Sequence, residues 1–106
     1  MDFRTGLELS FLQLDASKPV SSRLSAVGER VLQAPGDLVV LPEMFATGFR
    51  TDAAAVAQPM DGAVVASMRE WAVRSRKAVA GSVAVADGGG FRNRMLFVRP
   101  SGEISW

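Results

Sequence analysis

Asp37-Leu-Val-Val-Leu-Pro-Glu-Met-Phe-Ala-Thr-Gly-Phe49 is the stretch that decides the expected fold, because an apolar run ends there in a single carboxylate. Leu38 to Leu41 has the length and the β-branched content of a buried strand. Pro42 cannot donate the next hydrogen bond of a β-ladder, so strand pairing should stop at this residue. Glu43 is therefore expected at the carboxyl edge of a strand, where open α/β sheets place their ligand crevices.

The neighbours of Glu43 in the sequence are apolar: Met44, Phe45 and Phe49. Such neighbours would partly remove water from the carboxylate, which is the environment in which a carboxylate acts as a general base. A lone glutamate after a strand is more often a solvated loop residue, and only its position favours catalysis. Phe45 is expected in the core, whereas Phe49 fits a core position and a substrate-binding position equally well. Thr47-Gly48 is expected to form a tight turn beside the site.

The residues before this stretch predict a strand, a helix and a return to the sheet. Leu7 to Leu14 alternates and then becomes apolar on both sides, as in a strand of a sheet covered on both faces. A helix follows, with Ser21 or Ser22 as its N-cap and Ala34-Pro-Gly36 as its stop; its apolar stripe is Val20, Leu24, Val27, Val31 and Leu32. Because such a crossover is right-handed, the strand at Leu38 should run parallel to the first.

The residues after the stretch predict further helices. Ala53 to Ala57 fits a short helix after Thr51 or Asp52, and Asp61 is placed to cap a longer one. The stripe of the longer helix comprises Val64, Val65, Met68, Trp71 and Ala72. Basic residues in and after its last turn should oppose the negative end of its own dipole; they are Arg74, Arg76 and Lys77.

The last third of the chain predicts a β-hairpin. Ala78 to Ala86 and Phe91 to Arg99 fit two strands joined by Asp87-Gly-Gly-Gly90. A phosphate-binding loop would lead into a helix, and this glycine run leads into a strand. Asn93 is expected to have a structural role, and the arginines around it suggest an exposed or edge face that discourages strand addition; they are Arg92, Arg94 and Arg99. Pro100-Ser-Gly102 then turns the chain into a final strand. The expected class is α/β, in the order strand-helix-strand-helix-strand-strand.

Composition excludes several kinds of protein. The 106 residues suffice for one domain at most, and 48% hydrophobic residues indicate a globular chain. The 12 basic and 11 acidic side chains are scattered, so nucleic-acid or membrane binding is not expected. Without a signal-like or membrane-spanning run, a cytoplasmic protein is the default expectation. Cysteine and histidine are both absent, which argues against disulfides, zinc sites and Ser-His or Cys-His nucleophiles.

Leu41-Pro-Glu-Met-Phe-Ala-Thr-Gly-Phe49 resembles the glutamate segment of the nitrilase (carbon-nitrogen hydrolase) superfamily, and most closely its omega-amidase branch. Gly81 to Val85 and Arg92 to Glu103 resemble the same branch in order and spacing. The likeness covers almost the whole chain. It implies an α-β-β-α sandwich that hydrolyses a small carboxamide without a cofactor or metal, usually as a dimer or larger homo-oligomer.

The resemblance also implies a Glu-Lys-Cys triad, and only Glu43 can be carried over onto this sequence. The lysine would follow shortly after the strand that begins near Ile104, and the cysteine further downstream. We therefore expect residues 1–106 to be the amino-terminal portion of a carbon-nitrogen hydrolase domain, inactive alone because the thiol is missing.

Two alternatives remain at this point. The chain fits a noncatalytic α/β module that works by association, since half of a two-sheet sandwich leaves an apolar sheet face uncovered. It also fits an unrelated α/β domain that binds a nucleotide, although no glycine-rich turn leads from a strand into a helix.

Overall fold

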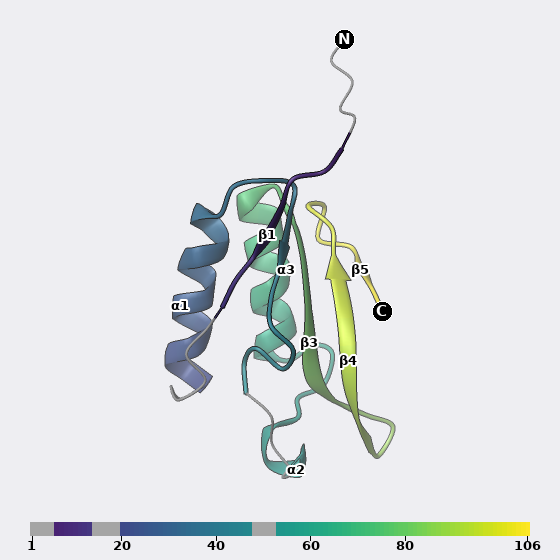
Figure 1. Cartoon of the computed structure of the whole chain (residues 1–106). Coiled ribbons are helices and arrows are strands. Elements are labelled where there is room, and N and C mark those ends of the chain that lie inside the picture. Colours follow the sequence, from purple (N-terminus) through teal and green to yellow (C-terminus); the bar gives the residue numbers. More distant parts are fainter. Residues whose placement is uncertain (1–5, 14–19, 48–52) are drawn as a thin grey trace.

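The computed structural model describes residues 6–13, 20–47 and 53–106. It is an α/β fold in which the predicted elements follow one another in the predicted order (Figure 1). The strands are β1 (Leu9–Phe11), β2 (Leu38–Val40), β3 (Ala78–Asp87), β4 (Gly90–Val98) and β5 (Ile104–Ser105). The helices are α1 (Val20–Gln33), α2 (Ala53–Val56) and α3 (Ala63–Ser75).

The strands form one sheet in the order β1-β2-β3-β4-β5. β1, β2 and β3 are parallel, as the crossover rule predicts, whereas β4 and β5 each pair antiparallel to their neighbour. β3 and β4 form the predicted hairpin, with Asp87 opposite Gly90. Gly88 and Gly89 have φ angles of 58° and 82°, the conformation that a two-residue hairpin turn requires and that glycine adopts at little cost. The glycine run is thus a turn between strands.

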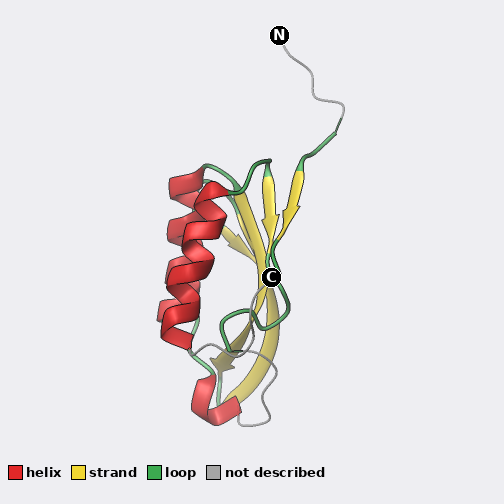
Figure 2. Ribbon diagram, turned by 60° about the vertical axis from the view of Figure 1, so that its left-hand side comes forward, coloured by secondary structure: helices red, strands yellow, loops and turns green. Residues whose placement is uncertain are grey.

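The core lies between the sheet and the two long helices, which cover the same face (Figure 2). The predicted stripe of α3 is buried throughout, and α1 contributes Val27 and Val31, which are fully buried. The facing sheet residues alternate with those of the opposite face; they include Val39, Val79, Val83, Val85, Leu96 and Val98. Helical and strand periodicities therefore identify this side of the core correctly.

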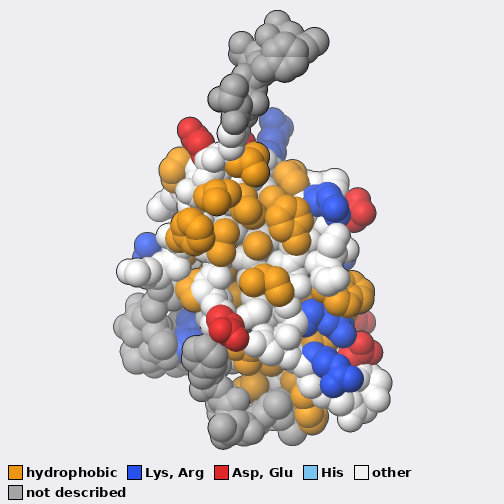
Figure 3. Space-filling model, turned by 45° about the vertical axis from the view of Figure 1, so that its right-hand side comes forward, with side chains coloured by type: hydrophobic (Ala, Val, Ile, Leu, Met, Phe, Trp, Pro, Cys, Tyr) orange, Lys and Arg blue, Asp and Glu red, His pale blue; other side chains and the backbone are white. Residues whose placement is uncertain are grey.

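The described residues leave the other face of the sheet uncovered, whereas Leu7 to Leu14 was expected to enter a sheet covered on both faces; Leu14 itself lies outside the described residues. β1 is only three residues long, and Leu7 and Phe11 are 72% and 70% exposed. The pairing register continues this face across the sheet to β4, where the exposed apolar side chains are Phe91, Met95 and Phe97. Figure 3 shows hydrophobic side chains gathered over this side. An apolar pattern on both faces predicted a cover that the described residues do not supply.

Both predicted helix caps are wrong. Helix α1 begins at Val20, so Ser21 and Ser22 lie inside its first turn. Helix α3 has Gly62 at its N-cap without a side-chain cap from that residue, and Gln58 Oε1 accepts a hydrogen bond from the Val64 amide at 3.0 Å. Gln58 reaches the helix end because its own backbone is bridged to Val85 of β3. A capping side chain that comes from outside the first turn of the helix cannot be predicted from the residue preferences at the N-cap position.

Lys77 stabilises a different helix from the one predicted. Its side chain is buried, and Nζ donates hydrogen bonds to the carbonyl oxygens of Val31, at 2.7 Å, and Ala34. These carbonyls lie at and just after the carboxyl end of α1, where cations are favoured and the last carbonyls lack helical partners. Burial lowers the pKa of Lys77, because desolvation disfavours the charged ammonium. Lys77 therefore ties the connection between α3 and β3 to the carboxyl end of α1.

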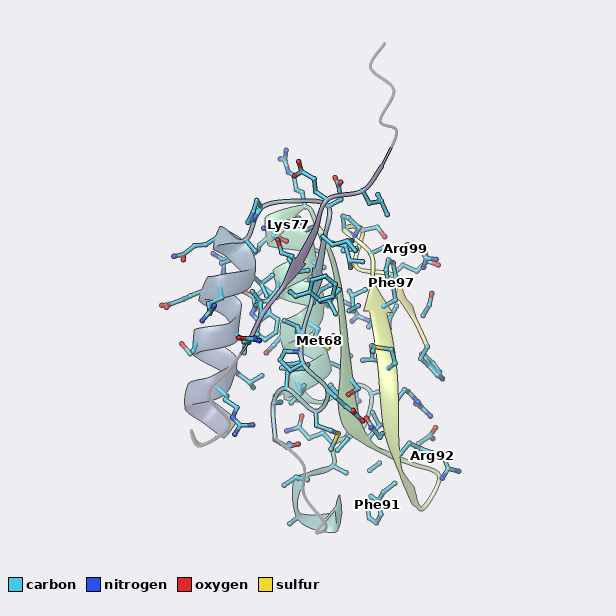
Figure 4. All side chains as sticks on the ribbon, viewed as in Figure 1. Met68, Lys77, Phe91, Arg92, Phe97 and Arg99 are labelled. Carbon is cyan, nitrogen blue, oxygen red and sulfur yellow. The ribbon has the colours of Figure 1, made fainter. Side chains whose placement is uncertain are left out.

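The prediction of an exposed or edge face holds in part for the arginines of this region. β5 pairs with β4 only at Phe97 and Val98, so among the described residues Arg92 and Arg94 have no strand partner on that side of β4. The Arg94 side chain is 13% exposed, pairs with Asp87 at 3.0 Å and lies 4.9 Å from the centre of the Trp106 ring. Arg92 and Arg99 are exposed, as predicted, and Figure 4 shows them at opposite ends of the strand. Among the described helices, none has the length and apolar character needed to span a bilayer.

Candidate active site

Glu43 lies in a turn directly after β2. The last backbone-to-backbone hydrogen bond of this segment to the sheet runs from the Leu41 amide to Ala80 O at 2.8 Å, and Pro42 follows. Strand pairing therefore ends before the proline, as predicted. The Thr47 amide donates to Met44 O at 3.2 Å, which closes the turn, and Met44 has a φ of 52°. The described turn spans Met44 to Thr47, and Gly48 of the predicted Thr47-Gly48 turn lies outside the described residues.

The backbone of this turn is tied to the hairpin. The Met44 amide donates to Ser82 Oγ at 2.8 Å, and Ser82 is only 4% exposed. A buried hydroxyl needs a hydrogen-bond partner, and this amide supplies one. The bond places the residue after Glu43 over the middle of β3.

The Glu43 carboxylate is exposed and accepts a hydrogen bond from Asn93 Nδ2 at 2.8 Å. The expectation that apolar neighbours partly desolvate Glu43 is therefore wrong for the described structure. Two observations explain the difference: the carboxylate meets the open face of the sheet at Asn93, and Phe45 points to the other side. Neighbours in the sequence of a turn do not remain neighbours in space.

Phe45 is a core residue, as predicted. It is 2% exposed, and its ring lies 6.1 Å from the ring of Trp71 in a tilted arrangement. Gly81 allows this packing, because a Cβ there would meet Leu41 Cβ at 3.1 Å and Phe45 Cδ1 at 3.2 Å. Phe45 therefore anchors the turn from the helical side. Phe49, the predicted substrate-binding residue, lies outside the described residues.

Sequence reasoning missed Asn93 and Ser82 as neighbours of Glu43. Asn93 was expected to have a structural role, whereas its amide binds the side chain of Glu43, fifty positions away. The sequence does contain a signal for them. Every second residue on this side of the two strands is apolar except these two: Ser82 lies between Ala80 and Ala84, and Asn93 lies between Phe91 and Met95. A polar residue at such a position needs a partner.

A shallow hollow of about 330 Å³ lies elsewhere, between β1 and α1. Its lining includes Phe11, Leu12, Arg30 and Pro35, and none of the described residues that line it carries a carboxylate. General acid-base chemistry needs a titratable group within reach of the substrate, so we place the candidate site at Glu43.

Comparison with protein families identifies the chain. The model of the carbon-nitrogen hydrolase family matches residues 13–106. The chain belongs to the carbon-nitrogen hydrolase family. Over 68 residues it is 46% identical to the omega-amidase YafV of Yersinia enterocolitica and 43% identical to that of Escherichia coli. Each match covers 64% of this chain and 26% of the relative, so the matched part spans about a quarter of these relatives.

Solved structures agree with this assignment. XC1258 from Xanthomonas campestris, described as a CN-hydrolase superfamily protein with an arsenic adduct in its active site, superimposes with a TM-score of 0.76 at 34% identity. The match covers 82% of this chain and 34% of XC1258. An N-terminal amidase superimposes with a TM-score of 0.78 at 16% identity, covering 94% of this chain and 26% of that protein. At that identity the likeness shows the shared fold only.

Proposed function

We propose that residues 1–106 are the amino-terminal portion of an omega-amidase-like hydrolase, in which Glu43 is the general base of a Glu-Lys-Cys triad. The observation that supports this proposal best is the position of Glu43, in a turn after a parallel strand and bound to Asn93, in a chain of the carbon-nitrogen hydrolase family. The substrate would be a small carboxamide, such as the amide of a 2-oxo acid.

The proposed reaction has two stages. Glu43 accepts the thiol proton of the cysteine, the thiolate attacks the amide carbon, and lysine donors stabilise the oxyanion. The carbon-nitrogen bond breaks as ammonia leaves with the proton returned by Glu43, and a thioester remains. Glu43 then takes a proton from the water that attacks the thioester, and the carboxylic acid and free thiol are released. The chain has no cysteine, so residues 1–106 alone should not turn over.

Ammonia release from a small carboxamide tests the proposal. In the protein translated from the whole coding sequence, Glu43→Gln should abolish turnover, because an amide cannot accept the thiol proton. Glu29→Gln is the matched control, since it removes an exposed carboxylate on α1, and it should keep full activity. Wild-type turnover by the Glu43→Gln protein would refute the general-base role. Turnover by residues 1–106 alone, abolished by Glu43→Gln, would refute the triad.

The open sheet face favours a second candidate function. An apolar face that includes Phe11 and Met95, 70% and 56% exposed, suits association with another chain. In this alternative the chain is a noncatalytic module derived from the hydrolase fold. Light scattering that finds a compact monomer, with no binding of an apolar dye, would count against it. A cytoplasmic location and a homo-oligomeric state belong to the enzyme proposal as well.

A further inference from the structure

We propose that Asn93 is a positioning residue, which holds one oxygen of the Glu43 carboxylate and leaves the other to accept a proton. The inference rests on the proposed function of Glu43. It starts from the hydrogen bond between Asn93 Nδ2 and Glu43 Oε1, 2.8 Å long, which joins a turn after β2 to the middle of β4.

The first argument is the pattern of the open face. On the β3-β4 hairpin the register assigns to this face, besides Ser82 and Asn93, only alanine, phenylalanine and methionine side chains: Ala78, Ala80, Ala84, Ala86, Phe91, Met95 and Phe97. Ser82 and Asn93 are its polar residues, and both bind the turn that carries Glu43. Ser82 holds the backbone of that turn and Asn93 holds its side chain. Both polar side chains on this face of the hairpin therefore form hydrogen bonds with the same turn.

The second argument is the chemistry of the donor. A carboxamide N–H donates to a carboxylate, and it neither titrates nor carries charge near neutral pH. Asn93 can therefore orient the carboxylate without placing a second charge beside it, which a neighbouring Lys or Arg would do. Within the described residues, Oε2 of Glu43 accepts no hydrogen bond. Among the described residues, one oxygen of the carboxylate thus has a protein donor and the other has none.

The third argument is that strand stability does not require asparagine here. Asparagine is depleted in strands, where β-branched residues are favoured. Asn93 is exposed, and its hydrogen bond with Glu43 competes with water, so the bond adds little to folding. Asn93→Val should therefore leave the fold as stable as before, or more stable, while it removes the donor. This separates positioning from a structural role.

The contact itself is tested on residues 1–106 by NMR, independently of any activity. With the chain labelled with ¹⁵N, Glu43→Ala should shift the side-chain amide signals of Asn93 and speed their exchange with water. Met95→Ala changes the next residue on the same face of β4 and should leave those signals in place. If Glu43→Ala does not move the Asn93 signals, the inference is overturned.

The consequence is tested in the protein translated from the whole coding sequence. Asn93→Val should lower kcat by about tenfold to a hundredfold, the effect of one hydrogen bond to a charged group, with KM changed by less than about threefold. Asn93→Gln, which keeps the amide, should recover part of kcat. Wild-type kcat in Asn93→Val, together with an inactive Glu43→Gln, would overturn positioning and leave the proposed function intact. An active Glu43→Gln protein would refute the proposed function. The NMR measurement would still show, independently, whether Asn93 contacts Glu43.

Discussion

Replacing Lys77 with methionine tests how the connection between α3 and β3 is held to the carboxyl end of α1. Methionine has a similar length and no donor, so the carbonyls of Val31 and Ala34 lose the hydrogen bonds from Nζ. Each of the two carbonyls left without a donor costs about 1–3 kcal/mol, and the lost charge at the end of α1 costs about 0.3–1 kcal/mol more. Removing the buried ammonium also removes the unfavourable free energy of its desolvation, which offsets part of this loss. We expect a net loss of about 2–4 kcal/mol.

Urea denaturation followed by circular dichroism measures this loss, and Arg74→Met is the matched control. Arg74 lies in the last turn of α3, is 60% exposed and pairs with Glu70 at 3.4 Å. An exposed pair of this kind contributes at most about 1 kcal/mol. The two variants remove the same charge, so an equal loss in both would refute the idea that Lys77 caps α1. It would favour the simpler view that the basic residues oppose the dipole of α3.

The pH dependence of the same variant tests the burial of Lys77. Its pKa in the folded chain lies below the value of about 10.4 in the unfolded chain. Between these two values the unfolded chain binds more protons, so the free energy of unfolding rises with pH through that window. The cost of Lys77→Met should therefore grow as the pH approaches about 10.4. A cost that falls instead would mean that the ammonium is stabilised by its surroundings.

Two further substitutions test local packing and capping. Gly28→Ala should destabilise the chain by about 1 kcal/mol, because the added Cβ would lie 2.6 Å from Nε1 of the buried Trp71. This steric cost should outweigh the better helix propensity of alanine, and a urea midpoint at or above the wild-type value would contradict it. Gln58→Ala should lower the free energy of unfolding by about 1 kcal/mol, because the Val64 amide loses its acceptor. Asp61→Ala should change that free energy by less than about 0.5 kcal/mol. If thermal denaturation shows the larger loss for Asp61→Ala, Asp61 is the cap after all.

Periodicity predicted the arrangement of the elements well. The stripe of α3 from Val64 to Ala72 and the hairpin turn at Asp87 to Gly90 are local patterns, and each has one favourable structure. The crossover rule then determined that β1 and β2 are parallel. The helix stripe and the hairpin turn depend on residues close together in the sequence, and the crossover rule applies to any strand-helix-strand unit, so a single sequence contains the necessary information.

Contacts between distant segments could not be predicted in the same way. Lys77 binds carbonyls more than forty positions away, and Asn93 binds Glu43 across fifty. Each contact depends on the pairing register and on the path of the connecting chain, which local preferences do not contain. The expected desolvation of Glu43 failed for the same reason. It assumed that Phe45 stays beside Glu43, whereas the turn sends Phe45 into the core.

The exposed carboxylate of Glu43 lies on the apolar face of the sheet, so one covering layer would affect both. Glu43 is bound to Asn93, which lies among Phe91, Met95 and Phe97 on that face. In the proposed enzyme, a second layer over the sheet would bury these apolar side chains, at about 1.5–3 kcal/mol for each one fully buried. The same layer would exclude water from the carboxylate and strengthen its bond to Asn93, because hydrogen bonds are stronger at low dielectric. Covering the face would thus stabilise the fold and prepare the base in one step.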